Sequence, residues 1–360
     1  MKRRARRQAA DGRQLFETET RRRSLEVVTL ACICLTAYVP QHAARDPFSV
    51  LEPAVTLTRE DRDDLRAGRT VVRSLDTGNP SQLAVFIGGR VTTTPEQFIV
   101  DILESARLWK SPKVPSTGTF REPVRREDVA GMTLPADDVD ALRHCRPGDC
   151  DVKLTAPEMA RLREAIARAG AEWRAAAQHE FRAIVLERIA AYRRSGLGAL
   201  RSFHDHRDPV DPAYVFSSLL AVSDAAAAVA PRLAAYFERF PDVPRPESSS
   251  EAMYWLETTH PPKRTIQAWH IAAQLQPRHT NPEVVVLSRQ LFATHYVNGS
   301  VALTALVQDT GGQRYLLYVN RSAVDGLEGF LSGLRRFFVE RRVHSGARTA
   351  FEHLTGRLTH

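Results

Sequence analysis

Side chains that could bind a metal gather most densely at His204-Asp205-His206-Arg207-Asp208 in this sequence of 360 residues. Imidazole and carboxylate groups are common ligands of zinc and other transition metals, and the alternation would place His204, His206 and Asp208 on one side of an extended segment. Gly198 and Pro209 flank the group closely, a composition typical of a solvated loop. We therefore interpret it as a loop and expect no metal site.

A second group of reactive and aromatic side chains lies in segments that we predict to be strands. A histidine such as His270 or His295 could act as a general base if another group orients it. The sequence contains no Gly-x-Ser-x-Gly, phosphate-binding loop or His-Glu-x-x-His motif to complete a catalytic site. We thus expect these residues to line a cavity and orient a ligand, with no catalytic residue and no cofactor. The expected ligand-binding residues are Trp255, Trp269, His270, His295, Tyr296, Tyr318 and Arg321.

Three arginines, Arg289, Arg314 and Arg321, could hold a carboxylate or phosphate in a forked hydrogen-bond geometry. Arg321 follows the last predicted strand, near what would be one mouth of a cavity. For Arg321 the preferred interpretation is a helix cap or a salt bridge to Asp325.

Cys145 and Cys150 are the cysteines that remain outside the first 44 residues. Pro147-Gly148 between them favours a tight reversal, which would bring the thiols to the separation that a disulfide requires. We predict a structural disulfide, because zinc normally needs four ligands and the spacing is wider than that of redox-active Cys-x-x-Cys motifs.

Residues 1–44 have the order of a secretory signal, with basic residues, then the apolar run Leu25–Val39, then small residues. The run is short for a membrane-spanning helix. We expect an exported protein in the periplasm or cell envelope; the alternatives are an inner-membrane anchor through residues 25–39 and a misplaced start codon. Much of the formal charge of +8 lies in this leader, so the remainder is nearly balanced and nucleic acid is not an expected partner.

The elements that would position these residues are clearest near the C-terminus. The apolar runs Glu283–Val297, Ser300–Gln308 and Arg314–Asn320 are separated by the turn signals Asn298-Gly299 and Gly311-Gly312, which predicts an antiparallel meander. One long helix should follow, because apolar residues recur at helical spacing at Val324, Leu327, Leu331, Leu334, Phe338 and Val343.

Earlier segments alternate in the same way. The sequence predicts strands at Thr70–Leu75, Gln82–Val91, Val114–Phe120, Met253–Thr258 and Thr265–Leu275. Helices are predicted at Glu96–Trp109, at Ala136–Arg143 and, as one element, from Pro157 to about Arg194.

This order of elements resembles the START-like, or SRPBCC, helix-grip superfamily. The run from Leu83 to Phe98 carries the resemblance at the front, and Arg314–Asn320 with Val324–Leu358 carries it at the back. The resemblance implies an α+β fold in which a curved antiparallel sheet grips a long C-terminal helix. Residues 45–124 and 251–360 would form that domain, and 125–250 a mostly helical insertion. The segment from Ser288 to Ser322 is also similar to uncharacterised bacterial proteins, which implies no activity.

The resemblance implies that an apolar cavity binds, and in some settings transports, a lipid or other hydrophobic small molecule. Two alternatives stay open: a hydrolase- or cyclase-like enzyme that uses the same cavity with His270 or His295 as base, and an interaction module that docks through the helical insertion. The basic pairs Arg335-Arg336 and Arg341-Arg342 could also contact an anionic membrane surface.

Overall fold

The computed structural model describes residues 46–104, 108–219, 221–260, 263–325, 327, 346 and 348–358. The chain divides into a first unit, residues 1–43, and a second unit, residues 44–360, which holds all the described residues. The predicted leader and residues 328–345 of the predicted C-terminal helix lie outside the described ranges. Within those ranges, every helix falls short of the length or apolarity that a bilayer crossing requires.

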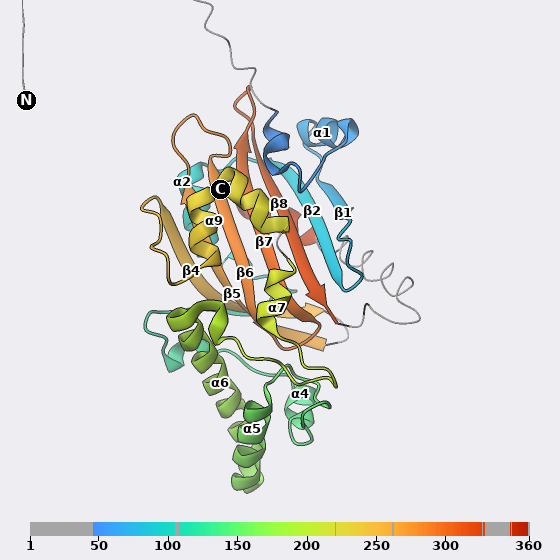
Figure 1. Cartoon of the computed structure of the whole chain (residues 1–360), viewed down its shortest axis with the longest axis vertical. Coiled ribbons are helices and arrows are strands. Elements are labelled where there is room, and N and C mark those ends of the chain that lie inside the picture. Colours follow the sequence, from blue (N-terminus) through green and yellow to red (C-terminus); the bar gives the residue numbers. More distant parts are fainter. Residues whose placement is uncertain are drawn as a thin grey trace, which may run out of the picture. The chain divides into compact units, whose positions relative to one another are not determined.

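The centre of the second unit is an eight-stranded antiparallel sheet with strand order β1-β2-β8-β7-β6-β5-β4-β3 (Figure 1). The sheet is curved and does not close, so β1 and β3 form its edges. The predicted α+β class with a curved antiparallel sheet is therefore confirmed. The strands are β1 (Val71–Leu75), β2 (Gln82–Val91), β3 (Ser116–Phe120), β4 (Ser249–His260), β5 (Lys263–Leu275), β6 (Val284–Ala293), β7 (Val297–Gln308) and β8 (Arg314–Val324).

The predicted turn at Asn298-Gly299 is wrong, because both residues lie within β7. The chain reverses one step earlier, at Tyr296, whose φ is +63°. Gly299 meets a need for space rather than for a turn: a Cβ there would lie 2.7 Å from Val215 of the helix packed above. The second predicted turn is confirmed, since Gly312 has a φ of +83° between β7 and β8.

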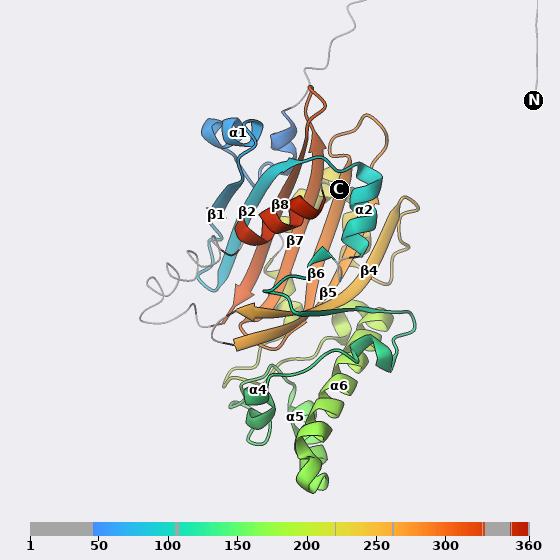
Figure 2. The ribbon, with the colours of Figure 1, turned by 180° about the vertical axis from the view of Figure 1, so that it is seen from behind.

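Helices cover both faces of the sheet. One face, called the α9 face here, packs against η1 (Pro47–Leu51), α1 (Arg59–Arg66), α7 (Pro212–Ser217), α8 (Ala221–Val229) and α9 (Pro231–Glu238). The opposite face, the α2 face, packs against α2 (Pro95–Leu103) and the helical residues at the C-terminus, coloured red in Figure 2. As the alternation in β8 predicts, Tyr315 and Leu317 belong to the core of the first face, and Leu316 to that of the second.

The described part of the C-terminal helix, residues 348–357, lies directly on the sheet. Phe351 and Leu354 are buried in the core of the α2 face. Contact is tight, because a Cβ added to Gly89 would lie 2.7 Å from the Phe351 ring. The predicted apolar positions Leu331, Leu334, Phe338 and Val343 fall outside the described residues.

The region between β3 and β4 is mostly helical. The prediction of a single helix from Pro157 to Arg194 in this region is wrong. That segment is a hairpin of α5 (Ala156–Arg168) and α6 (Trp173–Ser195), and the chain reverses near Gly170, whose φ is +54°. The pair Arg188–Glu158 joins the two helices. The other elements of this region are η2 (Arg126–Val129), α4 (Ala136–Ala141), η3 (Gly170–Glu172) and η4 (Gly196–Ala199).

Candidate functional site

A pocket of about 570 Å³ lies at the start of β4, beside the end of β3, the last turn of α6 and the loop that joins α9 to β4. Its wall is mixed: apolar side chains alternate with two acidic and two basic ones, and the surface that lines the hollow is slightly more polar than apolar. The lining residues are Thr119, Phe120, Glu122, Arg193, Tyr236, Phe240, Pro241, Val243, Pro244, Arg245, Glu251, Ala252 and Met253. A second hollow, of about 10 Å³ beneath α8 and α9, has room for little more than one water molecule.

Glu251 is the most constrained polar group in this wall. Alternation along β4 turns Glu251 and Met253 to the α9 face, and Met253 pairs with His270 of β5. Glu251 and His270 are therefore diagonal neighbours, within reach of long side chains. Glu251 Oε2 accepts hydrogen bonds from the Tyr236 hydroxyl and from His270 Nε2, the latter at 3.0 Å. The described residues supply no hydrogen bond to Oε1, and the side chain is 24% exposed.

His270 belongs to a buried series of donors that ends at this carboxylate. Arg289 Nη1 donates to the Tyr192 hydroxyl oxygen at 3.2 Å, and Tyr192 lies 3.0 Å from His270 Nδ1. Because a guanidinium only donates, Tyr192 donates its own proton to Nδ1, and His270 Nε2–H then donates to Glu251. We call Arg289, Tyr192, His270, Glu251 and Tyr236 the Glu251 chain.

Burial and hydrogen bonding set the charges in the Glu251 chain. Burial lowers the pKa of His270; the bond to Glu251 opposes this effect and the Arg289 guanidinium adds to it, so the ring is held neutral. Burial alone would raise the pKa of Glu251, but hydrogen bonds from His270 and Tyr236 outweigh it and hold that pKa below its ordinary value. Burial and the bond to Glu251 raise the pKa of Tyr236. The pocket wall therefore holds an ionised carboxylate beside a neutral phenol.

The other charged groups of the wall are unequally engaged. Arg193 bonds to Glu122 at 2.6 Å and to the Phe120 carbonyl at 3.0 Å. Arg245 is exposed and has no hydrogen bond or ion pair with any described residue. Arg193 Nε is also without a partner among the described residues, but that atom is buried. The groups with unused hydrogen-bonding capacity toward a ligand are therefore Glu251 Oε1 and the Arg245 guanidinium.

This arrangement suits binding better than proton transfer. A carboxylate with a lowered pKa is a weak base, and it is the group that faces the pocket. His270, the predicted alternative base, is fully buried with both ring nitrogens bonded. It therefore positions Glu251 and has no access to a ligand.

Apart from His270, the residues expected to bind a ligand are dispersed over both faces of the sheet. Trp255 is buried in a third core, between the sheet and the helices α4, α5 and α6, and donates to the Asp128 carbonyl at 2.8 Å. Trp269 and Tyr318 pack into the core of the α2 face. These aromatic residues contribute to separate cores and do not share a cavity with Glu251.

His295, Tyr296 and Arg321 lie near strand ends, also outside the pocket lining. The His295 ring is buried and bonds to Asp138 at 2.8 Å, which ties the β6–β7 turn to α4. Arg321 bonds to the Gln82 side chain at 2.6 Å and to the Thr77 carbonyl. The predicted salt bridge from Arg321 to Asp325 is wrong, because Asp325 pairs with Lys153.

The segment His204–Asp208 is a loop, as predicted, and its carboxylate at Asp205 is buried. Lys153, which is 1% exposed, places its ammonium against Asp205 at 3.1 Å, Asn298 at 2.7 Å and Asp325. We call these residues the Lys153 cluster. Its ammonium bonds to the Oδ2 atoms of both aspartates that, with His206, could have formed a metal site. Lys153 therefore supplies the positive charge at this point.

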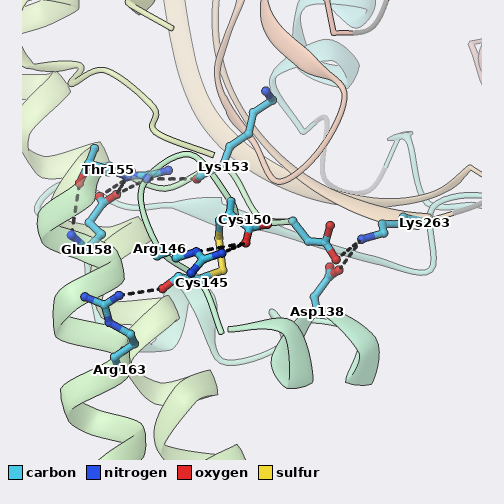
Figure 3. Close-up of a disulfide and its surroundings, with 12 residues drawn as sticks. Asp138, Cys145, Arg146, Cys150, Lys153, Thr155, Glu158, Arg163 and Lys263 are labelled. Carbon is cyan, nitrogen blue, oxygen red and sulfur yellow. Dashed lines mark hydrogen bonds and ion pairs between the residues drawn. A yellow bond between two sulfur atoms is a disulfide. The ribbon is translucent and has the colours of Figure 1, made fainter. Parts of the chain in front are cut away.

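The predicted disulfide between Cys145 and Cys150 is formed and lies next to the Lys153 cluster (Figure 3). Arg163 of α5 donates to the Cys145 carbonyl at 3.0 Å. The Cys150 amide donates to the Asp205 carbonyl at 3.0 Å. The disulfide loop thus ties the α5–α6 hairpin to the loop that holds Asp205.

Reasoning from the sequence missed the residues around the pocket. The predicted strand began at Met253, which left Glu251 outside it, and Tyr192, Tyr236 and Lys153 carried no recognisable spacing. Arg289 was considered as an anion clamp, but it is buried and bonds within the protein. The one available signal was an acidic residue on the inward side of a strand opposite a histidine, which becomes visible only when the β4–β5 register is known.

No protein-family model matches this chain, and no curated protein matches it. Solved structures similar to it include the Zhui aromatase/cyclase from Streptomyces sp. R1128, with a TM-score of 0.24 and 14% identity over 39% of this chain and 82% of that one. Another is Ara h 8.0201, with a TM-score of 0.22 and 10% identity over 41% of this chain and 89% of that one. Both similarities are remote and assign no function to this protein.

Proposed function

We propose that this protein binds a small molecule with an apolar body and a polar head in the pocket at the start of β4. The observation that carries the proposal is the Glu251 carboxylate, which lines the hollow and which His270 and Tyr236 hold ionised through bonds to Oε2. Its Oε1 atom has no protein donor among the described residues. An oriented, partly buried acceptor of this kind is stabilised when a ligand or water completes its hydrogen bonds.

The size and lining of the pocket support this proposal. Its volume of about 570 Å³ falls in the range of small-molecule sites, and its lining combines apolar side chains with four charged groups. Burial of the apolar body would supply most of the affinity, at roughly 25 cal/mol per Å² of apolar surface removed from water. The polar groups would fix the orientation of the ligand.

The proposed pocket differs from the cavity that the helix-grip resemblance implies. That cavity would lie between the sheet and the C-terminal helix, but over residues 348–358 this space is filled by side chains such as Phe351 and Leu354. The rest of the helix predicted from the sequence lies outside the described residues. We therefore assign ligand binding to the pocket at the β4 edge, on the opposite side of the sheet from these side chains.

We further propose that binding takes place in the cell envelope. The secretory pattern of residues 1–44 supports this location. The Cys145–Cys150 disulfide supports it as well, because such bonds persist mainly in oxidising compartments. Contact of the basic C-terminal helix with anionic lipid stays a prediction, since Arg335, Arg336, Arg341 and Arg342 lie outside the described residues.

The proposal is tested with a neutral fluorescent probe, N-phenyl-1-naphthylamine, and a variant that fills the pocket. Val243→Trp places a bulky ring in the lining loop and should weaken probe binding at least tenfold. Val100→Trp is the matched control, because Val100 is 49% exposed on α2 and does not line the pocket. Equal affinities of the two variants, or no probe binding to the unmodified protein, would overturn the proposal.

Native mass spectrometry of the protein purified from its own envelope fraction provides a second test. We expect a bound small molecule that is absent from the Val243→Trp variant. The same spectrum reports whether the leader has been removed. Identical ligand occupancy in both proteins would place the ligand elsewhere.

A further inference from the structure

We propose that the head of the ligand is zwitterionic, with a protonated amine that bonds to Glu251 and an acidic group that pairs with Arg245. The inference rests on the proposed function, because it concerns the same pocket and adds the chemical class of its ligand. The class is an apolar compound that carries an ammonium and a nearby acidic group, as in an apolar α-amino acid.

The amine is assigned to Glu251 because the other sides of this carboxylate are already occupied. His270 and Tyr236 both donate to Oε2, which leaves Oε1 of this pocket-lining side chain without a hydrogen bond from the described residues. Hydrogen bonds between an ammonium and a carboxylate are roughly twice as strong as neutral ones, and the partly buried position limits competition from water. The same carboxylate would repel an anionic head.

The acidic group is assigned to Arg245 by elimination among the charges of the pocket. Glu122 and Arg193 neutralise each other through a direct bond of 2.6 Å. Arg245 has no such partner among the described residues, yet it lies close enough to Glu251 to help lower the pKa of that carboxyl. The two uncommitted charges are thus opposite in sign and share one pocket, which favours a ligand with both charges over a simple amine or a simple acid.

The remaining wall defines the body of the ligand. Phe240, Pro241, Val243 and Pro244 form a run of aromatic, cyclic and branched residues along the loop that precedes β4. Such side chains pack against flat or branched apolar groups and offer few hydrogen bonds. An aromatic or branched body attached to a zwitterionic head would therefore match both parts of the lining.

The test compares four compounds that share an indole body: tryptophan, tryptamine, indole-3-propionate and the neutral indole-3-propanol. Isothermal titration calorimetry at neutral pH should show tryptophan binding at least tenfold more tightly than each of the others. If indole-3-propionate or indole-3-propanol binds as tightly as tryptophan, the zwitterionic head is wrong while the binding function stands. If none of the four compounds binds and the neutral naphthylamine probe also fails, the proposed function itself is wrong.

Two variants assign the two charges separately. Glu251→Gln keeps the shape of the side chain and should weaken the binding of tryptophan and of tryptamine at least tenfold. The affinity for indole-3-propanol should stay within twofold, which shows that the pocket is intact. Arg245→Gln should weaken the binding of tryptophan and of indole-3-propionate but leave the affinity for tryptamine unchanged. Equal losses for all compounds, or no loss for tryptophan in either variant, would contradict the assignment.

The same head chemistry occurs in a free amino acid and in a zwitterionic lipid. Dihexanoyl-phosphatidylethanolamine, which carries an ammonium and a phosphate, serves as the lipid arm of the titration. Tighter binding of tryptophan supports the amino acid source, and tighter binding of the lipid supports the lipid source; both outcomes require that Glu251→Gln abolishes the preference. A lipid that binds equally well to Glu251→Gln overturns the amine assignment.

Discussion

The Lys153 cluster and the Glu251 chain are both buried sets of charged and polar groups on this chain, but they end differently. The ammonium of Lys153 has three donors, and it meets acceptors on Asp205, Asn298 and Asp325. Asn298 returns a hydrogen bond to Asp325 at 2.7 Å. The Lys153 ammonium is satisfied by the protein itself, although the buried Asp205 Oδ1 has no hydrogen-bond partner among the described residues. The Glu251 chain instead ends on a side chain that lines a pocket.

A structural ion cluster and a binding site differ in whether their hydrogen-bonding groups are used inside the protein. Both sets join segments that are distant in sequence, so connectivity does not separate them. The three donors of Lys153 are all used inside the fold, and no member of the cluster lines either of the two hollows. Unused bonding capacity beside an apolar space is what marks Glu251 as the group that meets a ligand.

Removing the charge of Lys153 should produce the largest change in stability. Lys153→Met leaves two carboxylates without their buried cation, which we expect to lower the free energy of unfolding by about 3–5 kcal/mol. Denaturant unfolding measures the loss, and Lys113→Met, at an exposed position, is the control. A loss below about 1 kcal/mol would show that the cluster contributes little to folding.

Replacing both Cys145 and Cys150 by Ser should lower the free energy of unfolding by about 2 kcal/mol, the value expected for a short closed loop. The loop supports the Lys153 cluster and lies outside the pocket lining, so affinity for the naphthylamine probe should stay within twofold. Unfolding curves and probe titrations of the same preparation give both values. A marked loss of affinity would mean that the two regions are coupled.

Tyr192→Phe should have a smaller effect of about 1–2 kcal/mol, because it leaves His270 Nδ1 and one Arg289 donor without that partner. The ring stays in its contacts with Phe240. Tyr214→Phe is the control, since Tyr214 is 74% exposed. If the two variants are equally stable, the hydroxyl does not link Arg289 to His270 as described.

The pH dependence of the free energy of unfolding should report the lowered pKa values of His270 and Glu251. The folded-state pKa of His270 lies below its ordinary value of 6.5, so the unfolded chain binds a proton that the folded chain does not, and stability falls as the pH drops through that value. The lowered pKa of Glu251 acts at more acidic pH: its contribution is present above 4.5 and is lost as the pH falls through the folded-state pKa.

His270→Gln keeps one donor and one acceptor but removes the titrating ring. The variant should therefore reduce the dependence of the free energy of unfolding on pH between about pH 7 and pH 5. The titratable and charged groups that face residue 270 are Tyr192, Glu251, Arg289 and Arg193. Unfolding curves at several pH values measure the slope. An unchanged slope would assign the titration to another histidine.

The sequence was sufficient for elements with strong local patterns. Gln82–Val91 is a strand with the predicted bounds. The side chains of β8 alternate between the two faces of the sheet as predicted, because this alternation is a local property of an extended backbone. Gly311-Gly312 was predicted correctly as a turn for the same local reason.

Prediction failed where distant packing decides the structure. Asn298-Gly299 has the composition of a turn, yet Asn298 serves the Lys153 cluster and Gly299 leaves room for α7. The α5–α6 hairpin required the chain to reverse at Gly170, which interrupts an apolar pattern that reads as continuous. The Glu251 chain joins α6 and α9 to the strands β4, β5 and β6. It depends on strand register and on side-chain contacts that no local spacing in the sequence predicts.

The most direct test of ligand binding beside Glu251 is a crystal structure of the protein soaked with tryptophan or purified with its natural ligand. We predict difference density in the hollow that Glu251 and Arg245 line, with the polar end of the molecule at the carboxylate and its body along Phe240 and Pro244. Density between the sheet and the helix at residues 348–358, or an occupied crystal with an empty β4 pocket, would contradict it.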